Sequence, residues 1–251
     1  MRKPFIAGNW KMNMTHLEAI KFTQDFGYEF RNSKGCEVCL CPPFIALRSV
    51  KNIIDSDRIE VKLGAQNMHW EENGAYTGEV SPLMLSALGV EYVIIGHSER
   101  REYFFESNEV VNKKVKSAFK HNLKPIMCVG ESLAIRESGR AEEFVLCQVD
   151  ECLSGIEKKD IELLTIAYEP VWAIGTGKTA TSGDANDMCS AIRRKIAKIY
   201  NPETADMVRI QYGGSVKPSN ISELMSMSDI DGALVGGASI KLEDFTAILN
   251  F

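Results

Sequence analysis

The sequence lacks any apolar stretch close to the roughly 20 residues that a membrane-spanning helix needs, and it lacks runs of lysine or arginine. Its 29 basic and 34 acidic side chains leave a formal net charge of −5. The first residues are basic, but no sustained apolar segment follows them, which indicates a strand and not a signal peptide. We therefore expect a cytoplasmic protein with neither membrane nor nucleic-acid partners.

Cysteine is present, but in an odd number, seven, and without regular spacing. Cys36 and Cys39 form one C-x-x-C pair, which has no second pair to complete a zinc site. We expect buried, reduced thiols rather than a zinc or redox motif. His16, His69 and His121 lack carboxylate or cysteine neighbours at metal-ligand spacing, so no metal is predicted.

What the chain does have is a regular alternation of apolar and amphipathic segments. Eight short, mostly apolar runs are typical of strands that are buried on both faces of a parallel sheet. No change of composition and no linker rich in proline or serine interrupts the pattern, so we expect one domain over residues 1–251. The eight runs are residues 5–10, 37–41, 59–65, 91–96, 125–129, 163–168, 208–213 and 231–236.

Several segments between these runs have helical periodicity. Thr15 and Glu18 form a T-x-x-E capping box ahead of the first, and Asp184 is the expected N-cap of the third. The apolar positions are Ala19, Phe22, Phe26 and Phe30; Val111, Val115, Ala118 and Asn122, which ends the second stripe; and Ala185, Met188, Ile192, Ile196 and Ile199.

Eight strand–helix units suit either an open, doubly wound sheet or a closed barrel. Eight units in about 250 residues is the count and size of a barrel. A dinucleotide-binding open sheet would carry G-x-G-x-x-G after its first strand, and this sequence does not. The predicted fold is therefore an α/β protein with a single (β/α)8 barrel, the TIM barrel.

In such a barrel, chemistry takes place where strands end and the following loops begin. Glycine-rich turns, Gly213-Gly214-Ser215 and Gly236-Gly237, end the seventh and eighth runs. Turns of this kind bring backbone N–H groups close to a phosphate, although they could also be tight turns and nothing more. Polar residues that follow other runs are Asn9 and Lys11, Gln66 and Asn67, His97 and Glu99, and Glu169.

Three of these side chains suggest a reaction. Burial at the mouth of an apolar strand could raise the pKa of Glu169 toward that of a general base, although a rim glutamate is often simply solvated. His97 beside a helix N-terminus would stay neutral and donate a hydrogen bond, or it could be structural. Lys11 would attract an anionic substrate, unless it is a surface lysine. Together they suit proton transfer next to a carbonyl on a small phosphorylated sugar.

The segment after Glu169 contains Gly175-Thr176-Gly177-Lys178-Thr179, which invites comparison with a phosphate-binding P-loop. Trp172 stands where the leading glycine of that motif should be, so the comparison fails. Glycines in a long segment after a candidate base suit a lid instead.

Five motifs resemble the triosephosphate isomerase family, and the resemblance covers essentially the whole chain. They are residues 7–13, 95–101, 167–180, 212–216 and 232–239. The resemblance implies a cofactor-independent isomerase of glycolysis and gluconeogenesis. Its reaction would interconvert dihydroxyacetone phosphate and D-glyceraldehyde 3-phosphate through an enediol or enediolate.

The resemblance also implies a role for each matching residue. Glu169 would move the proton between two carbons, neutral His97 would polarise the carbonyl, and Lys11 would supply positive charge, with Asn9 lining the site beside it. Four further positions would bind the phosphate, two would support the site, and two segments would be lid hinges. They are Gly175, Ser215, Gly236 and Gly237; Glu99 and Cys128; and residues 170–172 and 178–180.

Residues 64–80 resemble the protruding third loop of that family, which docks into a neighbouring subunit. The resemblance implies a two-fold homodimer in which Thr77 reaches the active site of the partner. Two residues depart from the family pattern. Phe105 stands where glycine is more frequent, and Gln211 precedes Tyr212 where an apolar residue is common.

Two other functions remain open at this point. The chain could be a phosphosugar-binding protein that has lost turnover, but Glu169, His97 and Lys11 are all present, which argues against decay of the site. It could be a barrel aldolase that forms a Schiff base on a lysine. Lys11 lies beside Asn9 and not in a deep apolar pocket, which disfavours the lowered pKa that such a lysine needs.

Overall fold

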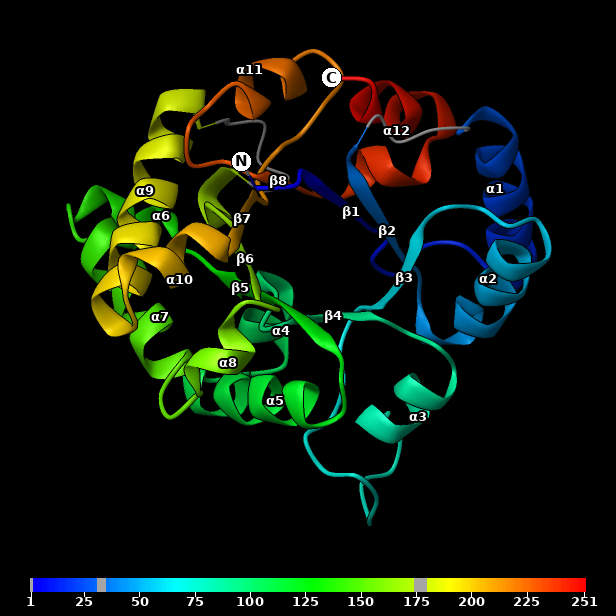
Figure 1. The fold of residues 1–251 in the computed structure, drawn as a ribbon, viewed down its shortest axis with the longest axis horizontal. Coiled ribbons are helices and arrows are strands. Elements are labelled where there is room, and N and C mark those ends of the chain that lie inside the picture. Colours follow the sequence, from blue (N-terminus) through cyan, green and yellow to red (C-terminus); the bar gives the residue numbers. More distant parts are fainter. Residues whose placement is uncertain (1, 31–34, 174–179) are drawn as a thin grey trace.

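Eight parallel strands close into a barrel, in which each strand pairs with the next along the chain and β8 pairs with β1 (Figure 1). The computed structural model describes residues 2–30, 35–173 and 180–251. The predicted (β/α)8 barrel is confirmed. The strands are β1 (Phe5–Asn9), β2 (Glu37–Cys41), β3 (Lys62–Ala65), β4 (Tyr92–Ile95), β5 (Lys124–Val129), β6 (Thr165–Tyr168), β7 (Arg209–Tyr212) and β8 (Gly232–Val235).

Most strands are shorter than the apolar runs that predicted them, and the third differs most. The predicted strand 59–65 begins only at Lys62. The N–H of Ile59 donates to the carbonyl of Ile54, and that of Val61 donates to the carbonyl of Ile59. Ile59 and Val61 are thus buried in the turn that leaves a helix, which an apolar pattern cannot distinguish from a strand.

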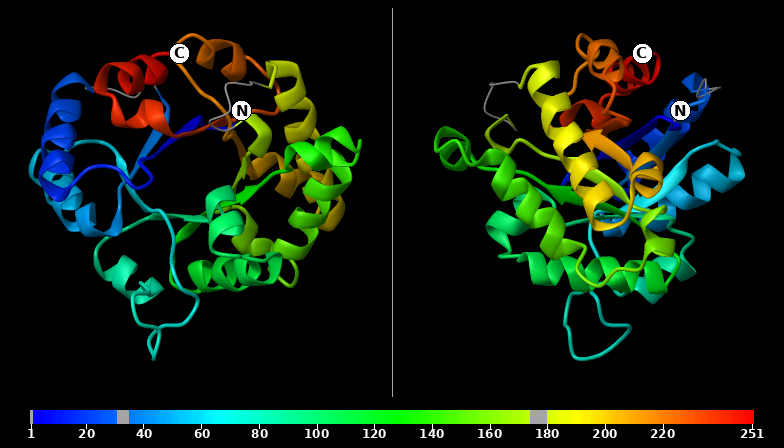
Figure 2. Two further views of the ribbon diagram at one scale, coloured as in Figure 1. Left: turned by 180° about the vertical axis from the view of Figure 1, so that it is seen from behind. Right: turned by 60° about the vertical axis from the view of Figure 1, so that its left-hand side comes forward.

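Helices surround the barrel (Figures 1 and 2). They are α1 (His16–Glu29), α2 (Phe44–Ser56), α3 (Pro82–Ala87), α4 (Ser98–Tyr103), α5 (Asn108–Lys120), α6 (Leu133–Glu137), α7 (Ala141–Cys152), α8 (Lys158–Ile161), α9 (Ser182–Ile199), α10 (Pro202–Met207), α11 (Ile221–Met225) and α12 (Leu242–Leu249), with short 3-10 turns η1 (Val171–Ala173) and η2 (Gly237–Ile240). Among the helices in the described ranges, none is long and apolar enough to cross a bilayer.

The helix ends follow the local sequence. The capping box of Thr15 and Glu18 forms as predicted at the start of α1. The prediction that Asp184 caps α9 is wrong, because Thr181 is the N-cap and Asp184, the third residue of α9, completes a second capping box. Thr181 Oγ1 accepts from the N–H of Asp184 at 3.0 Å, and the Asp184 carboxylate accepts from the N–H of Thr181 at 3.3 Å. The predicted stripe that ended at Asn122 belongs to α5, which stops at Lys120.

Apolar side chains form two layers, a large one between strands and helices and a small one inside the barrel. All seven cysteines are free thiols, and all but Cys147 are buried, as the sequence predicts. Cys39, Cys41 and Cys128 point into the barrel with Phe5 and Tyr92. These thiols act as small apolar fillers of the barrel interior.

The loop between β3 and α3 projects away from the barrel (Figures 1 and 2). It belongs to the segment 64–80 that the sequence singles out. Its tip, from Asn73 to Glu79, is exposed.

Substitution of Gly232 tests how closely β8 packs against β1 where the barrel closes. A Cβ at this position would lie 1.8 Å from the carbonyl oxygen of Phe5, its partner on β1. Relief of this clash would require the backbone of β1 or β8 to move. Gly232→Ala should therefore lower the free energy of unfolding by roughly 3 kcal/mol or more. Gly183→Ala is the matched control, since the nearest atom to its Cβ is 3.8 Å away and alanine favours helix. Urea unfolding followed by circular dichroism measures both, and equal stability of the two variants would contradict the argument.

Candidate active site

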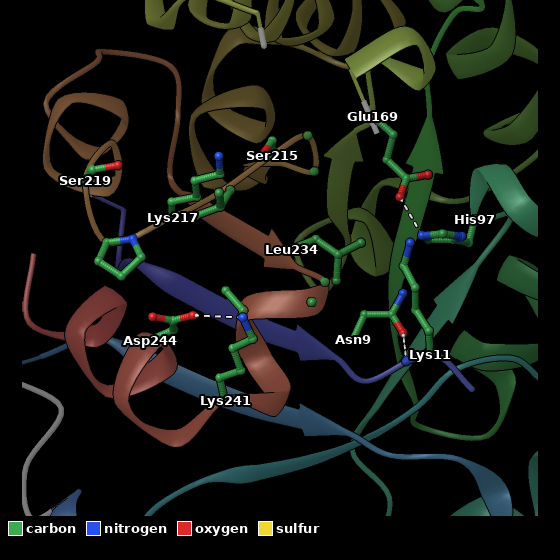
Figure 3. Close-up of a pocket in the computed structure, with 17 residues that line it drawn as sticks. Asn9, Lys11, His97, Glu169, Ser215, Lys217, Ser219, Leu234, Lys241 and Asp244 are labelled. Carbon is green, nitrogen blue, oxygen red and sulfur yellow. Dashed lines mark hydrogen bonds and ion pairs between the residues drawn. The ribbon is translucent and has the colours of Figure 1, made fainter. Parts of the chain in front are cut away.

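The carboxyl ends of the strands open into a cavity of about 650 Å³ (Figure 3). Its wall comes from the segments that follow β1, β4, β6, β7 and β8. Most of the predicted catalytic and substrate-binding residues line it: Asn9, Lys11, His97, Glu169, Ser215, Gly236 and Gly237. Gly175, which was predicted with them, lies outside the residues that the structure describes.

Glu169 and His97 face each other across the mouth of the barrel (Figure 3). Oε1 of Glu169 is 2.9 Å from Nε2 of His97, and Oε2 accepts the N–H of Ser98 at 2.9 Å. His97 caps α4, and its Nδ1 accepts the N–H of Glu99 at 3.3 Å. Because Nδ1 is an acceptor, we assign the ring proton to Nε2, which then donates to Glu169. The predicted helix N-terminus beside His97 is therefore present.

The pKa values of this pair depend on one another. Burial alone would raise the pKa of Glu169, but His97, the N–H of Ser98 and Lys11 stabilise the carboxylate and lower it below its ordinary value. The sequence-based expectation of a raised pKa is thus wrong for this arrangement. Burial alone would lower the pKa of His97, but the Glu169 carboxylate outweighs burial and raises it.

Lys11 directs its ammonium group into the same cavity (Figure 3). Its Nζ lies 2.7 Å from Oε1 of Glu99, which explains the place of Glu99 in the predicted set. Its backbone adopts φ +52°, a left-handed conformation that is rare for a lysine. The N–H of Lys11 donates to Oδ1 of Asn9 at 3.1 Å, and Nε2 of Gln66 donates to its carbonyl at 2.9 Å. The side chains of Asn9 and Gln66 therefore hold the strained backbone of Lys11 in place.

The two glycine turns form the opposite wall of the cavity. η2 begins at Gly237, and the first N–H groups of any helix have no partner within that helix. A Cβ at Gly236 would lie 3.5 Å from Cε of Lys11, whereas one at Gly237 would meet no atom within 4 Å. The turn therefore presents open backbone close to a cation, which suits an anionic group such as phosphate.

The first predicted hinge, residues 170–172, is anchored by a residue that the sequence analysis missed. Glu131 follows β5 and is fully buried. Its carboxylate accepts from Trp172 Nε1 at 2.8 Å and from the hydroxyl of Tyr168 at 3.1 Å, and its carbonyl accepts the N–H of Val171 at 3.1 Å. The available signal was a carboxylate two positions after the predicted strand 125–129. Of the second hinge, only Ala180 lies within the described residues.

Other polar residues of the cavity were also missed. They lie beyond the glycine turns, at its outer end: Lys217, Ser219, Lys241 and Asp244 (Figure 3). Lys241 and Asp244 form an ion pair of 3.9 Å. Their positions shortly after the two glycine turns could have revealed them.

None of the three predicted supporting residues, Glu99, Cys128 and Thr77, is among those that line the cavity. Cys128 lies inside the barrel on β5, where burial and then Glu169 raise the pKa of its thiol and keep it protonated. Thr77 is exposed on the projecting loop and is not part of this chain's own cavity. Over the described stretches of the chain, no three His, Cys, Asp or Glu side chains gather as a metal site would require.

Comparison of the sequence with known proteins identifies the family of this chain. The family model described as triosephosphate isomerase matches residues 4–251. A protein named triosephosphate isomerase from Thermoanaerobacter sp. (strain X514) is 59% identical over 251 residues, 100% of both chains. Proteins of the same name from Caldanaerobacter subterraneus subsp. tengcongensis and Clostridium perfringens (strain 13 / Type A) are 58% and 55% identical over 100% of both chains.

The chain belongs to the triosephosphate isomerase family. Triosephosphate isomerases interconvert dihydroxyacetone phosphate and D-glyceraldehyde 3-phosphate in glycolysis, and this chain is such an isomerase, an intramolecular oxidoreductase. The family, fold and reaction predicted from the motifs are thereby confirmed. This family is itself a standard example of the (β/α)8 barrel, of its lid loop and of a Glu–His pair that does acid–base work.

The mutual dependence of the two pKa values can be measured. In Glu169→Gln the ring of His97 loses its principal negative neighbour while it stays buried near Lys11, so the pKa of His97 should fall. Glu99→Gln is the control and should lower it less, because Glu99 has a weaker influence on the ring than Glu169. NMR titration of the histidine ring signals reports both. An unchanged or higher pKa of His97 in Glu169→Gln would show that the carboxylate does not control the ring.

Proposed function

We propose that this isomerase uses Glu169 as its base, His97 as its neutral hydrogen-bond donor and Lys11 as its cation. The observation that carries the proposal is the 2.9 Å contact between Glu169 Oε1 and His97 Nε2, at the edge of a cavity that Lys11 and two glycine turns also line. A substrate that entered between Glu169 and His97 would meet a proton acceptor on one side and a donor on the other.

In this proposal, Glu169 takes a proton from the carbon next to the carbonyl. The electron pair of that C–H bond forms the carbon–carbon double bond of an enediolate. The carbonyl oxygen becomes negative, and His97 Nε2–H and Lys11 stabilise that charge. His97 Nε2–H then protonates this oxygen and takes the proton of the neighbouring hydroxyl in return. Glu169 gives its proton to the carbon that carried the carbonyl, and the carbonyl forms on the neighbouring carbon.

Glu169 must leave Ser98 and His97 to reach the substrate, which ends the contacts that lower its pKa and makes it a stronger base. The same movement takes away the carboxylate that raises the pKa of His97, so the buried ring beside Lys11 is neutral when it meets the substrate.

The phosphate is proposed to bind the N–H groups of Ser215, Gly236 and Gly237, with Gly175 assigned by resemblance alone. Support comes from the cavity that the first three line and from the position of Lys11 beside Gly236. Closure of the segment after residue 173 would exclude water. Exclusion matters because an enediolate next to a phosphate ester can otherwise eliminate the phosphate.

Substitution of Glu169 tests the base. Glu169→Asp withdraws the carboxylate by about 1 Å, which should lower kcat at least ~100-fold and leave KM within a few-fold. An assay that converts glyceraldehyde 3-phosphate and detects dihydroxyacetone phosphate with an NADH-dependent dehydrogenase measures both. Glu142→Asp, at an exposed position of α7, is the control. Near-normal kcat in Glu169→Asp would remove Glu169 from this role, and binding without turnover in the parent protein would favour a phosphosugar-binding protein.

We further propose a homodimer that forms through the loop at residues 64–80, in the cytoplasm. The loop projects from the barrel with Tyr76 and Thr77 exposed, as a docking element would (Figure 2). The seven unpaired thiols suit a reducing compartment.

A charge on the loop tests the dimer. Thr77→Glu should produce monomers with lower kcat/KM, because a buried, unpaired carboxylate would oppose docking. Sedimentation velocity over a range of concentrations measures the association, and Ser138→Glu adds the same charge at an exposed site outside the loop. A Thr77→Glu dimer of normal strength would exclude this loop as the interface.

A further inference from the structure

The active-site cavity extends beyond the place where the substrate's phosphate is proposed to bind. Lys217 and Lys241 line its outer end, and Figure 3 shows both on the side of Ser215 that faces away from Glu169 and His97. A cavity of about 650 Å³ is of a size that holds drug-sized ligands, which are larger than a triose phosphate. The outer end therefore has room for a group that the triose phosphate does not contain.

Both lysines are attached to the turns that are proposed to bind the phosphate. Oδ1 of Asn220 accepts the N–H of Lys217 at 2.8 Å, and its Nδ2 donates to the carbonyl of Ser215 at 3.0 Å. Lys241 directly follows η2, and its N–H donates to the carbonyl of Ala238 at 3.3 Å. The backbone of each lysine is therefore held in place relative to a glycine turn.

The outer end carries a surplus of positive charge. Lys217 forms no ion pair with any residue that the structure describes. Nζ of Lys241 lies 3.9 Å from Oδ2 of Asp244, which is a long ion pair. Two cations thus face one carboxylate, in a chain whose formal net charge is −5. A local surplus of cations in an acidic protein favours the binding of an anion.

The phosphate of a triose phosphate does not account for this surplus. In the proposed arrangement it meets backbone N–H groups, with Lys11 beside Gly236. A triose phosphate ends at that phosphate, so no part of it extends toward the outer lysines. A ligand that reaches them has to continue from the phosphorus through a further P–O bond, and the anionic group that continues in this way is a second phosphate.

We propose that Lys217 and Lys241 form an outer anion subsite, which together with the glycine turns binds a diphosphate group. One phosphate occupies the N–H groups of the turns, and the second lies beside the two ammonium groups. This inference rests on the proposed phosphate position and goes further, because it adds a class of ligand that competes with the substrate. The ligand is free pyrophosphate or a diphosphate ester whose organic group points out of the cavity.

Inhibition of the isomerase by pyrophosphate and by orthophosphate tests the subsite. Both are measured against glyceraldehyde 3-phosphate at constant ionic strength and without divalent cations. Both should be competitive, and pyrophosphate should have the lower Ki because only its second phosphate contacts the outer lysines. The decisive quantity is the ratio of the two Ki values, since a change at the glycine turns affects both anions and largely cancels in the ratio.

Three substitutions locate the second phosphate. Lys217→Gln and Lys241→Gln should each reduce the preference for pyrophosphate roughly 2- to 5-fold, the size of a contact between exposed charges. Asp244→Asn should increase the preference, because it removes a negative charge that repels the ligand and competes for Lys241. Lys198→Gln is the matched control. It removes the same charge from an exposed position near the end of α9, outside the cavity, and should leave the ratio unchanged.

The possible outcomes separate this inference from the proposed function. If neither anion competes with the substrate, both the proposed phosphate position and the outer subsite are wrong. If orthophosphate competes and pyrophosphate binds no more tightly, the outer subsite alone is wrong. A preference that survives in both lysine variants would also overturn it, because the higher charge of pyrophosphate would then explain its affinity. A nucleoside diphosphate in the same assay identifies the source of the group, since a Ki equal to that of pyrophosphate supports esters and a higher one supports the free anion.

Discussion

The contact between Glu169 and His97 is the interaction around which the rest of the active site is arranged. A carboxylate that is almost fully buried is costly unless hydrogen bonds and opposite charge stabilise it. Here both oxygens are satisfied, one by the imidazole and one by the N–H of Ser98. The carboxylate is therefore stable in this arrangement, and in the proposed mechanism it is released when a substrate displaces these partners.

Glycines on both sides of Glu169 leave space for this residue, because they have no side chain. A Cβ at Gly130 would lie 1.7 Å from the carbonyl oxygen of Glu169, and one at Gly213 would lie 2.8 Å from its Cγ. The adjacent strands β5 and β7 are thus each followed by a glycine where the chain passes Glu169, the residue after β6. Glu131 then secures the segment that follows. Three neighbouring strand ends together position one carboxylate.

Patterns in the sequence predicted those features that depend on residues close together in the chain. Apolar runs gave the strands, Thr15 and Glu18 gave a helix start, and polar residues at strand ends gave most of the cavity wall. The lowered pKa of Glu169 was not predictable, because its partners His97 and Ser98 lie just after β4, Ser98 71 positions earlier in the sequence, and only closure of the barrel brings them together. Glu131 had a signal in its place shortly after a predicted strand, but its contacts with Tyr168 and Trp172, 37 and 41 positions later, could not be read from the sequence.

The two departures from the family pattern have different physical consequences. Gln211 is fully buried, and its Nε2 donates to the carbonyl of Phe5 at 2.9 Å, which offsets part of the cost of burying its amide, while its Oε1 has no hydrogen-bond partner among the described residues. Phe105 has no comparable compensation, because its ring is mostly in solvent and its backbone is strained. A departure that the monomer accommodates needs no partner to explain it. The monomer leaves Phe105 exposed and strained, although contacts of Glu106, Lys114 and Asn67 hold its turn against the base of the projecting loop, and nothing among the described residues explains a phenylalanine at this position.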